Sequence, residues 1–332
     1  MVKVALLGYG YWGPNLARCL NESRSAELSY IIDLNETNRD KARSRFPHAI
    51  VSDDWNLPIN DPELQGIVIA TPAKTHYELA KSALSAGKDV FVEKPLALSL
   101  AEGEELVELA QKKERILMVG HLMLYHPAVE RIKEMVKRRE IGNPYYFFSQ
   151  RLNLGKVRSD ENVLWSLAPH DISMLLYIFD EMPSSVCAHG GCFLQEKIED
   201  IVFIHLDFPS GIMADIQVSW LAPHKIRRVL IVGEQKMLIF DDVEPFEKLK
   251  VYEHSIDIKP NAIMNTFTPR YGDIHSPALP PTEPLRAECE EFIRCIQTRE
   301  KPKSDGEEGL MVLKVLESAQ RSLETGEKVS LQ

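Results

Sequence analysis

The fold is decided by the stretch Val2-Lys-Val-Ala-Leu-Leu-Gly8-Tyr-Gly10-Tyr-Trp-Gly13. Its apolar run Val2–Leu7 predicts a buried strand, and residues 12–21 predict the helix that follows. Glycines at such a junction allow a tight turn and bring main-chain N–H groups close to a pyrophosphate at the helix N-terminus. The stretch therefore predicts a dinucleotide site, with Gly8, Gly10, Tyr11, Trp12 and Gly13 as its first cofactor-binding residues.

Asp33 lies 20 residues beyond Gly13, at the end of the next predicted strand. A carboxylate there accepts hydrogen bonds from the adenosine ribose hydroxyls and repels a 2′-phosphate, which favours NAD(H) over NADP(H). Two alternatives stay open: Asp33 is a surface carboxylate, or Arg39 meets a 2′-phosphate.

The first 120 residues alternate apolar runs with amphipathic stretches, which predicts a parallel sheet covered by helices on both faces. Capping boxes are expected where Thr75 is followed by Glu78 and Ser99 by Glu102. The predicted strands are 2–7, 28–32, 66–70, 90–92 and 116–119, and the predicted helices are 12–21, 36–46, 75–86 and 100–114.

The pattern changes after Val119, where strands joined by turns predict a mainly antiparallel sheet with one covered face. Residues 259–284, rich in Pro and Gly, predict a loop. The predicted strands are 145–150, 185–190, 201–208, 212–220, 228–232 and 236–240, and the predicted helices are 127–139, 167–179, 284–298 and 307–325.

The charge balance excludes some functions. The chain has 39 Lys+Arg against 49 Asp+Glu, and the net charge of −10 argues against a nucleic-acid-binding protein. Nearly all the excess acid lies in residues 151–332, with 20 basic and 29 acidic side chains. We expect neither a signal peptide nor a membrane span. The five cysteines lack CxxC spacing, so we expect no metal site and a reduced, cytoplasmic protein.

Two further segments follow strands at the carboxyl edge of the predicted parallel sheet, where doubly wound sheets bind ligands. Thr71 and Pro72 follow one strand, and His76 lies in the first turn of the next helix. Glu93 and Lys94 close another strand, where a lysine beside a nicotinamide polarises or deprotonates a substrate hydroxyl. His76 as a helix-start hydrogen bonder and Lys94 as a solvated strand-end lysine are the alternatives.

These motifs together resemble the glucose–fructose oxidoreductase/inositol dehydrogenase (Gfo/Idh/MocA) family over essentially the whole chain. The resemblance rests on Gly8–Gly13, on Ala70-Thr71-Pro72 with His76, on Ala86-Gly87-Lys88 leading to Glu93-Lys94-Pro95, and on Gly120-His121 followed by Tyr125-His126-Pro127.

The resemblance implies an α/β fold of two domains. The first is an NAD(P)-binding Rossmann domain with a doubly wound parallel sheet, residues 1–121. The second is an α+β domain with a large, mostly antiparallel open sheet, residues 122–332, for substrate binding and oligomerisation. It also implies oxidation or reduction of a sugar or cyclitol hydroxyl with a nicotinamide cofactor, by a homodimer or homotetramer.

The resemblance assigns Lys94 as the catalytic lysine and His170, in Ala168-Pro169-His170-Asp171, as the acid/base. Many relatives carry an aspartate one helical turn before this histidine, whereas this chain has Ser166. Serine supplies no charge to an imidazolium, so either Lys94 and His170 share the proton, or Asp171 or a substrate group compensates.

The segment before His170 resembles the subgroup that oxidises C3 of UDP-linked N-acetylhexosamines or their uronates. Arg151, Lys156 and Arg158 fall within eight residues and supply cations of the kind that a pyrophosphate needs. A solvated loop is the alternative for these three, and interface packing is the alternative for Trp165. The predicted substrate-binding residues are Lys94, Tyr125, Arg151, Arg158, Asn162, Trp165 and His170.

The leading hypothesis is thus an NAD-dependent dehydrogenase of UDP-GlcNAc or UDP-GlcNAcA. A free-sugar or inositol dehydrogenase is the second hypothesis, and a catalytically silent NAD-binding regulatory protein is the third. Lys94 and His170 speak against the third, and Ser166 speaks mildly for it.

Overall fold

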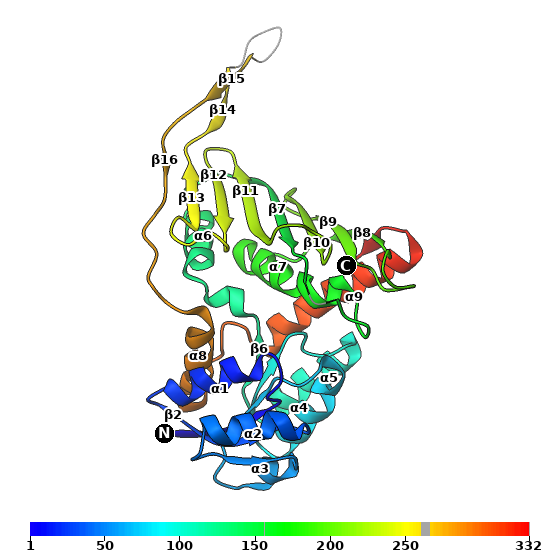
Figure 1. Ribbon diagram of the computed structural model, residues 1–332. Coiled ribbons are helices and arrows are strands. Elements are labelled where there is room, and N and C mark those ends of the chain that lie inside the picture. The colour runs from blue at the N-terminus through cyan, green and yellow to red at the C-terminus, as the bar shows by residue number, and fades with distance from the viewer. Residues whose placement is uncertain (156, 260–265, 332) are drawn as a thin grey trace. The chain divides into compact units, whose positions relative to one another are not determined.

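The computed structural model describes residues 1–155, 157–259 and 266–331, and these form two compact units (Figure 1). The first unit combines Met1–Tyr125 with Thr282–Leu313, and the second combines His126–Pro281 with Lys314–Gln332. The last of the three points where the chain passes from one unit to the other falls inside the helix at residues 306–325. The domain division at residues 121 and 122 stays a prediction.

A six-stranded parallel sheet forms the centre of the first unit, in the order β3-β2-β1-β4-β5-β6. This order, which grows outward in both directions from β1, is that of a doubly wound dinucleotide-binding sheet and confirms the predicted fold class. The strands are β1 (Val2–Leu7), β2 (Ala26–Ile32), β3 (Ile50–Ser52), β4 (Gly66–Ile69), β5 (Asp89–Glu93) and β6 (Leu117–Gly120).

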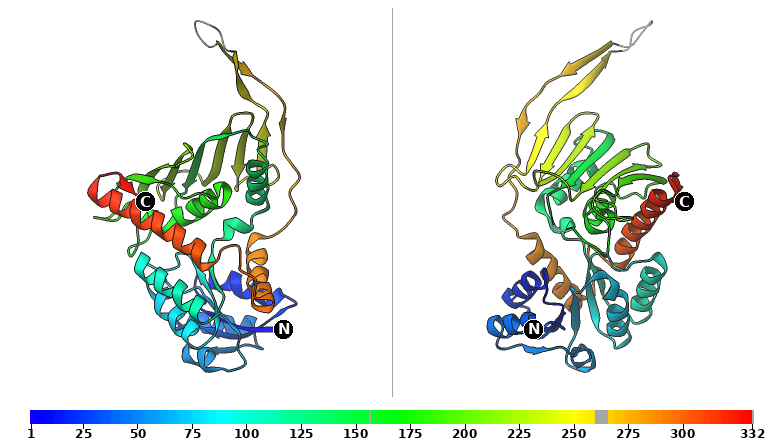
Figure 2. Two further views of the ribbon diagram at one scale, coloured as in Figure 1. Left: turned by 180° about the vertical axis from the view of Figure 1, so that it is seen from behind. Right: turned by 45° about the vertical axis from the view of Figure 1, so that its right-hand side comes forward.

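Helices cover both faces of this sheet because its inner strands are apolar on both sides. Ala5, Leu7 and their neighbours pack against α4 and α5, whereas α1 and α8 lie side by side on the other face (Figures 1 and 2). The helices are α1 (Gly13–Glu22), α2 (Glu36–Arg45), α3 (Asn56–Asn60), η1 (Ala73–Thr75), α4 (His76–Ser85), α5 (Leu100–Lys112), η2 (Leu122–Tyr125), α8 (Pro284–Thr298) and the first part of α9 (Gly306–Thr325).

The two predicted capping boxes have different outcomes. At α5 the Ser99 hydroxyl accepts the Glu102 N–H, and the Glu102 carboxylate in turn accepts the Leu98 N–H. At α4 the prediction is wrong, because Thr75 makes no capping bond and its hydroxyl lies 2.7 Å from Thr71 Oγ1 and 2.8 Å from the Pro72 carbonyl. The turn η1 before α4 directs the Thr75 side chain back to the strand end.

The second unit contains a nine-stranded sheet, in the order β16-β13-β12-β11-β7-β10-β9-β8-β17. Within the described strands of this sheet, β7 and β10 alone pair in parallel and the other pairs are antiparallel. The prediction of a mostly antiparallel sheet is therefore confirmed. The strands are β7 (Pro144–Leu152), β8 (Ser185–Gly191), β9 (Ile201–Asp207), β10 (Met213–Ser219), β11 (Ile226–Gly233), β12 (Met237–Asp241), β13 (Leu249–Tyr252), β16 (Ile274–His275) and β17 (Val329–Ser330).

Helix α7 (Val163–Phe179) lies on this sheet against β7, β9 and β10, beside α6 (Pro127–Lys137) (Figure 2). It begins four residues before its predicted start at residue 167, because Asn162 caps it by accepting the Trp165 N–H on its side-chain oxygen. The longer helix places Trp165, Ser166 and His170 on one rigid element.

The loop predicted for residues 259–284 is wrong in part. Strands β14 (Ser255–Lys259) and β15 (Thr266–Arg270) pair as an antiparallel hairpin, which extends from the nine-stranded sheet (Figure 1). Residues 260–265 lie outside the described residues. Among the residues that are described, no helix is both long enough and apolar enough to span a bilayer.

Candidate functional site

The glycine loop after β1 has the local geometry that its sequence predicts. Gly8 has a φ of +96°, and a Cβ there would lie 2.6 Å from the Ala70 carbonyl oxygen, so only glycine fits. A Cβ on Gly13 would collide with the Gly8 carbonyl oxygen. At Gly10 a Cβ would meet no atom within 4 Å, so the main chain is approachable there. The loop is tightly packed at both ends and open in the middle.

Asp33 is fastened to this loop. Its carboxylate accepts the Tyr9 N–H at 2.6 Å and the Asn35 N–H at 2.8 Å, with the Asn38 amide at 3.3 Å. These bonds tie the end of β2 to the glycine loop and fix the carboxylate at the carboxyl edge of the sheet. Asp33 is therefore not simply a solvated surface group.

The Arg39 guanidinium is engaged by the turn that follows β2. Its guanidinium donates to the carbonyl oxygens of Asp33 and Leu34 at 2.8 and 2.9 Å, and it pairs with Glu36. The side chain is buried. Its donors are thus committed to the turn between β2 and α2.

Trp12 and Tyr11 lie differently from each other. Trp12 acts on the Glu93 carboxyl group and lowers its pKa, whereas the Tyr11 side chain is exposed. Trp12 thus links the loop after β1 to the end of β5. Cofactor contact by either side chain stays a prediction.

His76 is buried at the start of α4. Its Nδ1 lies 2.7 Å from the Pro95 carbonyl oxygen and its Nε2 lies 2.9 Å from the Thr71 carbonyl oxygen. Burial lowers its pKa, against the pull of these two carbonyls. The ring thereby joins the ends of β4 and β5, which is a positioning role; its contact with a cofactor stays a prediction.

Glu93 and Lys94 end β5 beside these groups, and the Lys94–Pro95 peptide bond is cis. Removal of water raises the pKa of the Glu93 carboxyl to about 7, although the Lys94 charge, the Lys94 N–H and Trp12 act in the opposite direction. The Lys94 side chain is partly exposed. A carboxyl group with a raised pKa and a lysine thus lie at the edge where doubly wound sheets bind ligands.

In the second unit Arg151, which the sequence predicts as a cation for a pyrophosphate, already has a partner within the protein. It is buried on β7, and its Nε donates to Asp171 Oδ2 at 2.5 Å. Ser149 donates to the other oxygen of the same carboxylate, also at 2.5 Å. The Arg151 charge is already compensated inside the protein, and so is that of Asp171.

Asn162 and Trp165 also have protein partners. The Asn162 amide donates to Glu199 at 2.6 Å and to Gln320 at 2.9 Å, and the Trp165 indole donates to the same Gln320 oxygen at 3.2 Å. These bonds anchor the start of α7 to α9. The Trp165 ring remains partly exposed, but its N–H is in use.

Arg158 and Tyr125 complete the predicted set. Arg158 is half-exposed and pairs with Glu161 at 2.9 Å, while Lys156 lies outside the described residues. Tyr125 is buried, with its hydroxyl 3.0 Å from Ser304 Oγ and the Lys303 ammonium 4.9 Å from its ring centre. Arg158 therefore keeps its guanidinium group at the surface, whereas the Tyr125 ring is buried.

His170 and Ser166 lie one turn apart on α7, with His170 partly exposed and Ser166 buried. Asp171 follows His170, but its carboxylate is held by Ser149 and Arg151. The possibility that Asp171 compensates for the missing aspartate is therefore disfavoured by its own partners.

Comparison with known proteins decides the family. A model described as an oxidoreductase family with an NAD-binding Rossmann fold matches residues 2–121, and one described as the C-terminal alpha/beta domain of that family matches residues 133–331. The chain belongs to the Gfo/Idh/MocA family. Its members are oxidoreductases that act on sugars or polyols, and this chain has their NAD-binding Rossmann fold.

Among its Gfo/Idh/MocA relatives, the myo-inositol 2-dehydrogenase of Thermotoga maritima is 25% identical over 342 residues, which cover 100% of this chain and 99% of that protein. The UDP-N-acetylglucosamine 3-dehydrogenase of Acidithiobacillus ferrooxidans is 27% identical over 252 residues, 76% of each chain. A solved structure of a UDP-N-acetylglucosamine 3-dehydrogenase from that organism superposes with a TM-score of 0.82 at 22% identity, over 99% of each chain. That structural likeness shows the shared fold.

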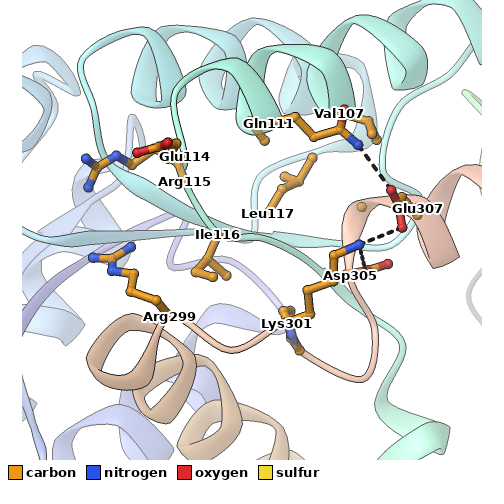
Figure 3. Close-up of a pocket in the computed structure, with 13 residues that line it drawn as sticks. Val107, Gln111, Glu114, Arg115, Ile116, Leu117, Arg299, Lys301, Asp305 and Glu307 are labelled. Carbon is orange, nitrogen blue, oxygen red and sulfur yellow. Dashed lines mark hydrogen bonds and ion pairs between the residues drawn. The ribbon is translucent and has the colours of Figure 1, made fainter.

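A pocket of about 610 Å³ in the first unit lies away from the predicted Gfo/Idh/MocA site (Figure 3). Ile116 and Leu117 line it at the amino end of β6, whereas Gly120, at the carboxyl end, pairs with Glu93. Lys301 and Gln111 bind Glu307 across it. It therefore opens at the opposite edge of the sheet from Asp33 and Lys94.

Among the described residues, no cluster of three or more His, Cys, Asp or Glu could hold a metal ion.

Sequence analysis missed Glu288 and Glu308, two carboxyl groups buried near the end of β5. A signal for Glu288 was present, since it interrupts the apolar stripe Leu285, Cys289, Phe292 and Ile296 of α8. A charged residue among helical core positions is unusual and points to a role.

Proposed function

We propose that the protein oxidises a secondary hydroxyl, at C3, of a nucleotide-linked N-acetylated sugar such as UDP-GlcNAc or UDP-GlcNAcA, with NAD⁺ as the oxidant. The observation that carries the reaction class is the carboxyl edge of the parallel sheet, where Asp33 is tied to the glycine loop and Lys94 ends β5. The sugar-nucleotide substrate is supported by the Acidithiobacillus ferrooxidans relative and by the resemblance of residues 151–165.

The residues at this edge fit a nicotinamide dinucleotide. Gly10 leaves open space over the main chain, and the positive end of the α1 dipole favours a pyrophosphate there. The Asp33 carboxylate lies at the same edge and is the acceptor proposed for the ribose hydroxyls. Arg39, the residue that could favour a 2′-phosphate, is bound to carbonyl oxygens instead. These features support NAD(H) over NADP(H).

Replacing Asp33 by asparagine is expected to raise the KM for NAD⁺ about tenfold and to lower the KM for NADP⁺. One charged hydrogen-bond acceptor is lost, worth roughly 1.5–3 kcal/mol, and the repulsion of a 2′-phosphate disappears. Steady-state rates with each cofactor measure the change, and Asp40→Asn, an exposed change on α2, is the matched control. An unchanged ratio of the two KM values would remove Asp33 from cofactor selection.

When bound, the nicotinamide accepts a hydride from the carbon that carries the hydroxyl. In this proposal the His170 imidazole, whose ordinary pKa is about 6.5, takes the hydroxyl proton. Lys94 Nζ donates a hydrogen bond to the substrate oxygen and stabilises the negative charge that develops there. Glu93, Trp12 and His76 hold the end of β5 from which Lys94 extends.

Replacing Ser166 by aspartate is expected to move the acid limb of the kcat/KM pH profile upward by about one unit. A carboxylate one helical turn from His170 stabilises the imidazolium, which raises the pKa of the base in the free enzyme. Ser166→Asn, of the same size but without charge, should leave the limb in place. An unmoved limb in the aspartate variant would show that His170 is not the titrating base.

A second candidate is a dehydrogenase of unlinked sugars or inositols. The observation that favours it is the engagement of Arg151, Asn162 and the Trp165 N–H by protein groups, because a pyrophosphate needs uncommitted donors. The Thermotoga maritima inositol dehydrogenase, which matches the whole chain, agrees with it.

Absorbance at the NADH band tests both candidates when purified protein and NAD⁺ are offered UDP-GlcNAc, UDP-GlcNAcA, unlinked N-acetylglucosamine and myo-inositol. Turnover of a UDP-sugar supports the proposal, and turnover of unlinked compounds only supports the second candidate. Tight NADH binding without turnover of any compound would favour a catalytically silent regulatory protein.

A further inference from the structure

The first unit contains a buried acid that the proposed chemistry does not use. Glu288 on α8 has no exposed surface, and neither of its carboxyl oxygens has a hydrogen-bond partner among the described residues. Its surroundings are apolar at Leu285 and Phe292. An ionised carboxylate cannot persist there without compensation, whereas a neutral carboxylic acid can.

Two contacts fix the register between α8 and β5. Arg299, just after α8, pairs with Asp89 at the start of β5, at 2.8 Å. About two helical turns earlier, Phe292 packs on Phe91, with ring centres 5.7 Å apart. The helix therefore runs antiparallel to the strand.

The same register brings Glu288 opposite Glu93. Glu288 precedes Phe292 by four residues, a rise of about 6 Å along the helix. Glu93 follows Phe91 by two residues, about 6.6 Å along the strand and on the same face. Because the helix and the strand run in opposite directions, both steps lead toward the carboxyl edge of the sheet. The two carboxyl groups, here called the acid pair, face the same part of the core.

The neighbouring strand and helices enclose the acid pair. A Cβ on Gly120 of β6 would lie 2.8 Å from Glu93 Oε2, so only glycine leaves room for that carboxyl group. Next to it, His121 Nδ1 and Glu308 Oε2 form a buried pair at 2.5 Å. The titratable or charged groups that act on the acid pair are Lys94 from β5, Cys19 from α1, Cys289 from α8, His121 after β6, Tyr125 from η2 and Glu308 from α9.

Lys94 follows Glu93 in the chain, and its positive charge acts on the Glu93 carboxyl group. Burial raises the pKa of Glu288 well above its ordinary value, and the Glu93 charge, Cys19 and Glu308 add to it. The pKa of Glu93 is about 7, and the Lys94 charge lowers it from what burial alone would give. Of the two acids, Glu288 therefore holds its proton more tightly.

We propose that Glu288 is a positioning residue that remains a neutral acid at neutral pH, so that the acid pair presents at most one negative charge, on Glu93, to Lys94. Two carboxylates would stabilise the Lys94 ammonium more strongly and would repel each other inside the core. One charge is enough to orient the ammonium group that donates to the substrate oxygen in the proposed reaction. The consequence for Lys94 rests on the proposed function; the protonation of Glu288 does not.

Infrared difference spectroscopy tests the proposal directly, because only a protonated carboxyl group shows the carbonyl stretch of a carboxylic acid. The spectrum of the wild type minus that of Glu288→Gln at pH 8 should contain this band. Glu290→Gln, an exposed change on the same helix, should leave the band in place. A wild type without a carboxylic-acid band at pH 8 overturns the proposal, even if the glutamine variant does not fold.

The pH dependence of stability is a second readout. Between the unfolded-state pKa of about 4.5 and the raised pKa of the folded state, Glu288 is protonated when folded and ionised when unfolded, so rising pH favours the unfolded wild type. Glutamine has no such effect. The unfolding constant of the wild type relative to Glu288→Gln should therefore rise up to about tenfold per pH unit between pH 5 and pH 8. A ratio that stays constant or falls overturns the proposal.

Turnover separates this inference from the proposed function. Glu288→Gln keeps the neutral state and should keep kcat at pH 7 within about twofold, well inside the loss expected for an acid/base group. A wild type that shows the acid band but no turnover contradicts the proposed function and leaves Glu288 assigned. A wild type that turns over without the band contradicts the assignment alone.

Discussion

Replacing Lys94 by alanine is expected to lower kcat about 10²- to 10⁴-fold while NADH still binds. The variant loses the Nζ group that, in the proposed reaction, donates a hydrogen bond to the substrate oxygen and stabilises the negative charge that develops there. Cofactor binding depends instead on the glycine loop and Asp33, which the change does not touch. Turnover is measured by NADH absorbance, and binding by titration of NADH fluorescence.

The control for this prediction is Lys112→Ala, which removes a lysine from the last turn of α5. It should keep both turnover and NADH binding. A Lys94→Ala protein with full activity would exclude Lys94 from the mechanism, and one that no longer binds NADH would show a structural role for the residue.

Replacing Arg151 by alanine is expected to lower the free energy of unfolding by about 3–5 kcal/mol. Its guanidinium is paired with the Asp171 carboxylate, and both groups are buried. Removal of one partner leaves an uncompensated charge between β7 and α7. Chemical denaturation at neutral pH measures the loss.

The double variant Arg151→Leu, Asp171→Leu distinguishes a structural pair from a ligand site. Removing both charges should recover much of the lost stability, because apolar residues can replace a buried ion pair at little cost. Arg158→Ala, which breaks a half-exposed pair, should cost at most about 1 kcal/mol. If Arg151→Ala instead keeps its stability and raises only the KM for a UDP-sugar, Arg151 is a substrate residue.

Local features of the fold were predictable because their causes lie close together in the chain. The Gly8–Gly13 loop, its strand and its helix form where the periodicity places them, and Ser99 caps α5 through a bond to a residue three positions away. Strand β3 was not predicted, since its three residues are partly exposed and lie at the edge of the sheet. The cap predicted at Thr75 fails although its cause is also local, because the Thr75 hydroxyl bonds to Thr71, four residues earlier.

The candidate site was predictable as a set of residue types and less so as a set of contacts. The run containing Arg151 and Arg158 is basic in sequence, yet Arg151 is neutralised by Asp171 from another element. Arg39, which sequence left open as a phosphate ligand, is held by carbonyl groups five and six residues before it. Charge counts show which charged side chains a segment contains, but not which of them form ion pairs with other elements in the folded protein.

By itself the sequence determined the Rossmann fold and the dinucleotide loop, because glycine and periodicity act through neighbours in the chain, and its resemblance to a family supplied the residues proposed for chemistry. The tertiary structure decided which charges are available. It paired Arg151 with Asp171, tied Asp33 to Tyr9, and set Glu288 on α8 opposite Glu93 on β5. The last of these joins residues almost 200 positions apart, and burial, which fixes whether such a group is charged, exists only once the chain has folded.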